Sequence, residues 1–121
     1  MESILTSIKK LLGITEEYTH FDADIMMHIN GVLVTLNQLG VGPAEGFVIS
    51  DELDTWEDFL GDNMLLQGNV VQFVYLSVKM VFDPSLSSAV LAATERQIRE
   101  LEWRITAMAE SLNNSTRTIA E

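Results

Sequence analysis

A long apolar stretch, NVVQFVYLSVKMVFDP from Asn69 to Pro84, is the feature that most limits how this chain can fold. Between Val70 and Phe82 the polar residues are few: Gln72, Ser77 and Lys79. A surface helix would show a continuous polar face, and a surface strand would alternate polar and apolar residues. This stretch does neither, so we predict that it is buried on most sides.

The length of the stretch favours a helix over a strand. Its many valines are typical of strands, but with Met64–Leu66 it covers about nineteen residues, whereas strands usually run about 3–10. Asp83 precedes a proline, which disfavours helical geometry and predicts the end of the helix there. We interpret the stretch as a central helix with Phe73, Leu76 and Phe82 in the core. It is expected to be too short and too interrupted to cross a membrane, which takes roughly 20 apolar residues.

Further helices are predicted on either side of this stretch. Ser3–Leu12 is amphipathic and precedes a glycine. A second helix is expected from a capping sequence at Thr19–Asp22 to about Leu39, and Phe47–Ile49 is read as a short extended piece. Thr55–Asp58 fits the capping pattern of a one- or two-turn helix ending near Gly61.

The last predicted helix, 87–112, has two sides that could pack. One side carries an apolar stripe at spacings of three and four: Leu91, Ile98, Leu101, Ile105, Met108 and Leu112. The opposite side carries small alanines and one large aromatic residue. We predict that this opposite side contacts another subunit or another protein through Arg96, Arg99, Trp103 and Ala107. The alternative is that Trp103 folds back on its own domain, against the N-terminal helix, because large aromatics are usually well buried.

These elements predict an all-α fold: a small helical bundle of four to five helices around a buried central helix, with a long C-terminal helix. The 121 residues suffice for one domain. We expect residues 1–112 to form this domain and residues 113–121 to be a polar, frayed tail. The lysines near the N-terminus follow the apolar residues, so no export signal is expected.

The charge distribution is uneven. The net charge is −11, and no Lys or Arg occurs between Leu11 and Val78, where eleven acids lie. Such a surface repels phosphate and is not expected to grip nucleic acid. The simpler reading is a solvated acidic face that aids solubility.

Chemically active groupings are not evident in the sequence. There is no cysteine for disulfides or thiolate metal sites, and no serine stands in a nucleophile-elbow motif. His20-x-Asp22-x-Asp24 lacks a metal-ligand spacing, and helix capping accounts for its acids. We therefore predict no enzyme, no metal and no cofactor.

Several phrases of the chain resemble the head–tail connector, or adaptor, proteins of tailed phages and prophages. They are LGITEEYTHFDADIMMHINGVLVTLNQLGVGPAEGF, TWEDFLGD, VKMVFDP and QIRELEWRI, which together cover most of Leu12 to Ile105. Relatives often have a double proline where this chain has Pro84-Ser85, and a more basic central helix. The resemblance implies a structural subunit without catalytic residues.

The resemblance also implies partners and a location. The subunit is expected to form a ring with itself, typically a dodecamer, in the virion neck beneath the portal protein, after assembly in the bacterial host cytoplasm. The ring would receive the next neck or tail-completion protein and let duplex DNA pass transiently, without membrane contact. Candidates for the lumen or its rim are Glu45, Asp51, Glu52, Asp54, Glu57 and Asp58. The alternative function is a monomeric helical adaptor or regulatory protein that binds a partner through its last helix.

Overall fold

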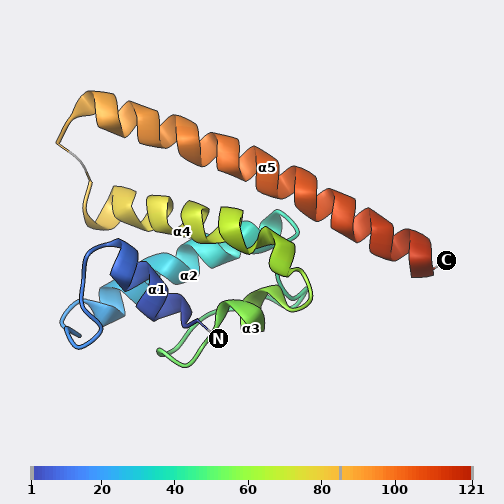
Figure 1. The fold of residues 1–121 in the computed structure, drawn as a ribbon, viewed down its shortest axis with the longest axis horizontal. Coiled ribbons are helices and arrows are strands. Elements are labelled where there is room, and N and C mark those ends of the chain that lie inside the picture. Colours follow the sequence, from blue (N-terminus) through green and yellow to red (C-terminus); the bar gives the residue numbers. More distant parts are fainter. Residues whose placement is uncertain (1, 85, 121) are drawn as a thin grey trace.

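In the computed structural model, a central helix lies between a long C-terminal helix and the N-terminal half of the chain (Figure 1). The structure describes residues 2–84 and 86–120, with the backbone alone for 114–120. The order of elements is α1 (Ile4–Leu11), α2 (Asp22–Gln38), α3 (Trp56–Leu60), the 3₁₀ helix η1 (Met64–Leu66), α4 (Gln67–Phe82) and α5 (Ser88–Ala120). No strand occurs in the described part, so the predicted all-α bundle with a long last helix is confirmed.

The predicted central helix is η1 followed by α4. Val70, Phe73, Val74 and Val78 are buried, and α4 packs against α1, α2 and α5. The helix ends at Phe82, and Asp83 then leaves helical geometry. The pre-proline position therefore ends the helix as predicted.

This central helix is less enclosed than the sequence predicts. Leu76 and Phe82 are half-buried, and the Val81 side chain is 62% exposed. Burial on most sides is wrong for the single chain, because α5 diverges from α4 towards its own N-terminus (Figure 1). Met64–Phe82 also has the length and apolar composition of a membrane span, contrary to the expectation that it is too short. The core helix of a soluble bundle can have the same length and composition, and α4 packs against α1, α2 and α5.

Helices α1 and α3 both bury apolar side chains in the core and are joined by a hydrogen bond. The Ser3 side chain caps α1, which buries Ile4, Leu5 and Ile8. Thr55 and Asp58 form the predicted capping box of α3, with Asp58 Oδ2 accepting from the Thr55 N–H at 3.0 Å. The cap aims Trp56 inward, where its Nε1 donates to Ser7 Oγ at 2.8 Å. This bond joins α3 to α1 across the core.

Helix α2 has the expected apolar stripe but a different beginning. Ile25, Ile29, Leu33 and Leu36 are buried. The predicted cap at Thr19–Asp22 is wrong, since Phe21 is the N-cap and no side chain caps the helix. Asp22 instead pairs with the Lys9 ammonium at 2.8 Å.

The buried lysine fixes the connection between α1 and α2. Its side chain is only 2% exposed, and Nζ also donates to the Glu16 carbonyl at 3.1 Å. A lysine is almost never fully buried unless it is paired. The pair therefore compensates a charge that sits inside the fold.

The segment after α2 is held by side chains rather than by strand pairing. Asn30 forms two hydrogen bonds with the Ile49 peptide group, at 2.7 and 3.0 Å, which takes the place of strand pairing at the predicted extended piece. Asn37 donates to the Val41 and Pro43 carbonyls. At Gly42, φ is +86°, and an added Cβ would lie 2.5 Å from the Phe59 ring. Only glycine fits that close approach to α3.

Helix α5 is longer than predicted. Leu101, Ile105 and Ala109 of its inner face are buried, and Ile98, Met108 and Leu112 pack against the core. The Asn69 amide approaches the Met108 sulfur at 3.4 Å, which locates the contact with the start of α4. The helix continues to Ala120, past the predicted end at Leu112. The division into a domain of residues 1–112 and a polar tail from Asn113 stays a prediction. Glu121 lies outside the described residues.

Candidate functional site

The outer face of α5, defined here as Arg96, Arg99, Trp103 and Ala107, is fully open to solvent. All four residues are exposed, and the Trp103 side chain is 71% exposed. Ala89, Ala92 and Ala93 extend this face towards the start of the helix and are exposed as well. The alternative in which Trp103 folds back onto its own domain is therefore wrong. The helix packs through one face and leaves the other without a partner in the single chain.

The acidic candidates of the segment 45–58 fall into two groups. The three aspartates hold local backbone: Asp51 accepts from the Leu53 N–H, Asp54 from the Ser50 N–H, and Asp58 from the Thr55 N–H. Within the described part of the chain, the side chains of Glu45, Glu52 and Glu57 make no hydrogen bond or ion pair. Local turn and cap formation thus explains the aspartates, and the three exposed glutamates are left without a structural role.

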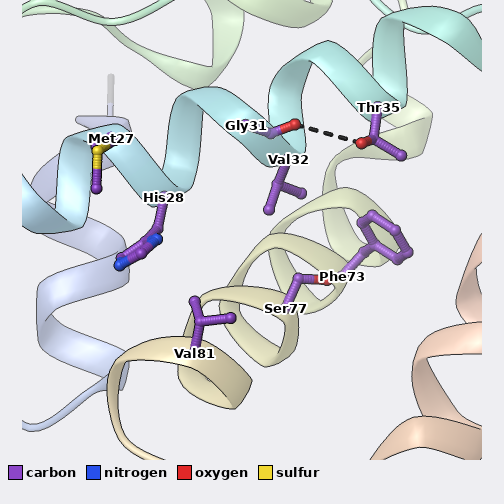
Figure 2. Close-up of a pocket in the computed structure, with 8 residues that line it drawn as sticks. All are labelled: Met27, His28, Gly31, Val32, Thr35, Phe73, Ser77 and Val81. Atoms are coloured by element: carbon purple, nitrogen blue, oxygen red, sulfur yellow. Dashed lines mark hydrogen bonds between the residues drawn. The ribbon is translucent and has the colours of Figure 1, made fainter.

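An apolar groove lies on the surface where α2 packs beside α4, and the sequence did not reveal it. The groove has a volume of about 340 Å³. Figure 2 shows His28 and Val32 of α2 above Ser77 and Val81 of α4, with Phe73 at one end and Met27 at the other. None of the residues that line it comes from α5. The one signal in the sequence was Gly31, a glycine in the middle of a helix.

The groups that could support catalysis are dispersed. His20 packs edge-on against the Phe21 ring at 4.7 Å, and His28 lines the groove. Asp22, a member of the His20-x-Asp22-x-Asp24 sequence, is engaged with Lys9. Among the residues that the structure describes, no group of three or more His, Asp or Glu side chains could hold a metal ion. The features available for function are therefore surfaces: the outer face of α5, the exposed glutamates and the groove.

Comparison with protein families relates the chain to a known family. A family model described as a phage connector protein matches residues 4–111. The match runs from the first residue of α1 to Ser111 in α5 and includes the groove, the segment 45–58 and all four residues of the outer face. No curated protein and no solved structure matches significantly.

Proposed function

The chain belongs to the phage connector protein family, and from this premise we propose that it is a ring-forming subunit of the virion neck that sits beneath the portal. The family is of a structural, non-enzymatic kind, located at the head–tail junction and in contact with other head and tail components. In the proposal the ring joins the DNA-filled head to the tail and lets the genome pass through its lumen. Assembly takes place in the bacterial cytoplasm.

The observation that carries the proposal is the second packing face of α5. A side chain as large as tryptophan loses a great deal of apolar contact when it stays in water. Tryptophan and arginine are also the residues most enriched among the energetic centres of protein interfaces. Trp103, with Arg99 one turn and Arg96 two turns before it, has this composition, and small alanines on the same face permit close approach of a partner. We assign this face to contact with a neighbouring subunit or the portal.

We expect Trp103→Ala to impair assembly, because the largest apolar side chain of the outer face is removed while the core is untouched. The measurement is a count of DNA-filled heads without tails, by electron microscopy, in a phage that carries the variant. Gln97→Ala, at an exposed position of α5 outside the outer face, is the control and should leave the count at the wild-type level. Wild-type numbers of complete particles with Trp103→Ala would contradict the assignment.

The exposed glutamates suggest a role in the channel. Non-specific affinity for DNA comes mainly from basic groups that release counterions from the phosphates. A wall of unpaired carboxylates would repel the phosphates and let DNA move without adhering. We place Glu45, Glu52 and Glu57 at the lumen or its rim, and expect the free protein not to bind duplex DNA at physiological salt.

The test for the acids should spare the aspartates, because Asp51, Asp54 and Asp58 stabilise turns and the α3 cap. The triple change Glu45→Gln, Glu52→Gln and Glu57→Gln should leave the thermal midpoint unchanged, since surface substitutions of this kind shift stability by about 0.5 kcal/mol or less. A lumen position predicts normal assembly with altered DNA retention or ejection. Weaker assembly, most visible at low salt, would instead place these acids against a basic partner surface. If neither assembly nor DNA retention and ejection changes, the three glutamates are only part of a solvated surface.

A further inference from the structure

We propose that the groove between α2 and α4 receives the outer face of α5 from a neighbouring copy of the chain, with Trp103 seated over Gly31. This inference rests on the ring-forming function proposed above and names the two surfaces that meet. One surface is the outer face of α5 with its projecting side chain Trp103, called the knob below. The other surface is the groove drawn in Figure 2. Both surfaces are open in the single chain, and they lie on different parts of it.

Gly31 has no explanation inside its own chain. A glycine in a helix interior lowers stability by about 1 kcal/mol relative to alanine, so its presence calls for a close contact or a special backbone angle. Gly31 has ordinary helical geometry, and a Cβ added to it would meet nothing within 4 Å. The missing side chain leaves room on the α2 wall of the groove. We infer that this room is used by a side chain from another copy.

The groove also suits an aromatic occupant by composition. Met27 and Val81 line the groove and are 63% and 62% exposed, whereas Val32 is half-buried and Phe73, at one end, is buried. Exposed apolar groups that border a concave surface are typical of interaction sites. A large, flat indole would cover both rim residues at once, and the sulfur of methionine makes favourable contacts with aromatic rings.

Charge and register identify the occupant as α5. Asp24 is exposed one turn before His28, and its side chain has no hydrogen bond or ion pair within the described residues. Arg99 is exposed one turn before Trp103, also without such a partner. If Trp103 lies over His28 and Gly31 with the two helices parallel, Arg99 reaches Asp24 and Ala107 reaches Thr35. The four arginines of the chain all lie in α5, whereas the segment that contains the groove wall α2 has no Lys or Arg.

The parallel arrangement agrees with the direction of the helices in one subunit. Figure 1 shows α2 and α5 running the same way along the molecule, with α4 running back between them. A neighbour generated by rotation about an axis close to the helix direction keeps this orientation. Because the knob and the groove are different patches, the contact is heterologous, and such contacts form rings when the rotation closes.

The absence of cysteine makes a direct test possible. Thr35→Cys and Ala107→Cys, each purified separately, are mixed with a short bifunctional thiol cross-linker, with Trp103 and Gly31 left intact. The control mixture pairs Ala107→Cys with Gln72→Cys, an exposed residue of α4 that does not line the groove. We expect several-fold more cross-linked heterodimer from the Thr35 mixture. Equal yields, or no product from either mixture, would overturn the proposal.

A glycine pair then separates assembly from stability. Gly31→Ala should raise the thermal midpoint of the monomer and weaken association by roughly tenfold, as overpacking a fitted contact by a methyl group commonly does. Gly68→Ala is the matched control, since Gly68 is helical and its added Cβ also meets nothing. It should leave association unchanged. A Gly31→Ala protein that associates like wild type would refute the docking. Native mass spectrometry separates this interface from the proposed neck function. If rings form but the Thr35 mixture gives no cross-link, only the interface is rejected. If neither rings nor the cross-link is found, the result counts against the interface and against the ring-forming function.

Discussion

Replacing Trp56 with alanine is expected to lower the free energy of unfolding by about 3–5 kcal/mol, the usual loss for a large buried aromatic. The side chain is 1% exposed and lies where α3 meets α1. Its removal leaves a cavity, and it also takes away the Nε1–H donor of Ser7 Oγ. A small domain has a total stability of about 5–15 kcal/mol, so the variant would be close to unfolding at room temperature. Urea denaturation followed by circular dichroism measures the change.

Trp56→Phe keeps the experiment informative if the alanine variant does not fold. Phenylalanine preserves most of the buried ring but not the hydrogen bond. The Ser7 hydroxyl still donates to the Ile4 carbonyl but loses its donor, so a loss of about 1 kcal/mol is expected. Trp103→Ala is the control on the chain's other tryptophan, and it should change the free energy of unfolding by about 0.5 kcal/mol or less. Equal losses at the two positions would mean that Trp103 is also part of the core, and would sink its assignment to an intermolecular surface.

The opposite environments of the two tryptophans were accessible from sequence, because helix periodicity and capping are local. Thr55 and Asp58 fix where α3 begins, and that beginning determines which way Trp56 points. In α5 the apolar stripe ending at Leu112 fixes the inner face, which leaves Trp103 outside. Local sequence features also predicted helix α1, from its amphipathic pattern, and the end of α4 before Asp83, from the proline that follows.

Features that depend on neighbours in three dimensions could not be predicted from the sequence. The groove depends on how α2 and α4 are placed side by side, and the periodicity of either helix alone does not determine that placement. The roles of Asp51, Asp54 and Asp58 depend on turn geometry, so the sequence could only count them among the acids. Enclosure of α4 was overestimated because an apolar stretch indicates that a surface will be covered, but not whether its own chain covers it. Val81, which lines the groove, is such a case.

Lys9 is the clearest residue that sequence reasoning missed. It belongs to a Lys-Lys pair near a helix end, where both side chains would ordinarily be solvated. Lys10 is exposed, whereas Lys9 turns inward to Asp22 across the link between α1 and α2. The signal that could have found it is Asp22, an acid at the first position of α2 whose partner lies on the preceding helix. Pairing of that kind is set by the path of the link and not by residue spacing.

Removing the negative member of this pair should be strongly destabilising. Asp22→Asn leaves the Lys9 ammonium buried with only neutral acceptors, the Glu16 carbonyl and the new amide oxygen, and without a compensating negative charge. Loss of one partner of a buried ion pair typically costs about 3–5 kcal/mol, and we expect the lower end of that range because Asp22 retains 22% exposure. Since the charge is enclosed, the loss should depend weakly on salt. Thermal and urea unfolding at low and high ionic strength measure both effects.

The reverse deletion should be milder, and this asymmetry identifies the buried charge as the cause. Lys9→Met keeps an unbranched side chain in the same space, while the Asp22 carboxylate can take up water through its exposed edge. We expect a loss of about 1 kcal/mol, within the range for volume-conserving core changes. Adding Asp22→Asn to Lys9→Met should then cost little, so the double variant is more stable than Asp22→Asn alone. A double variant whose loss of stability equals the sum of the two single losses would show that Lys9 and Asp22 are not energetically coupled. The connection between α1 and α2 would then be held by apolar packing alone.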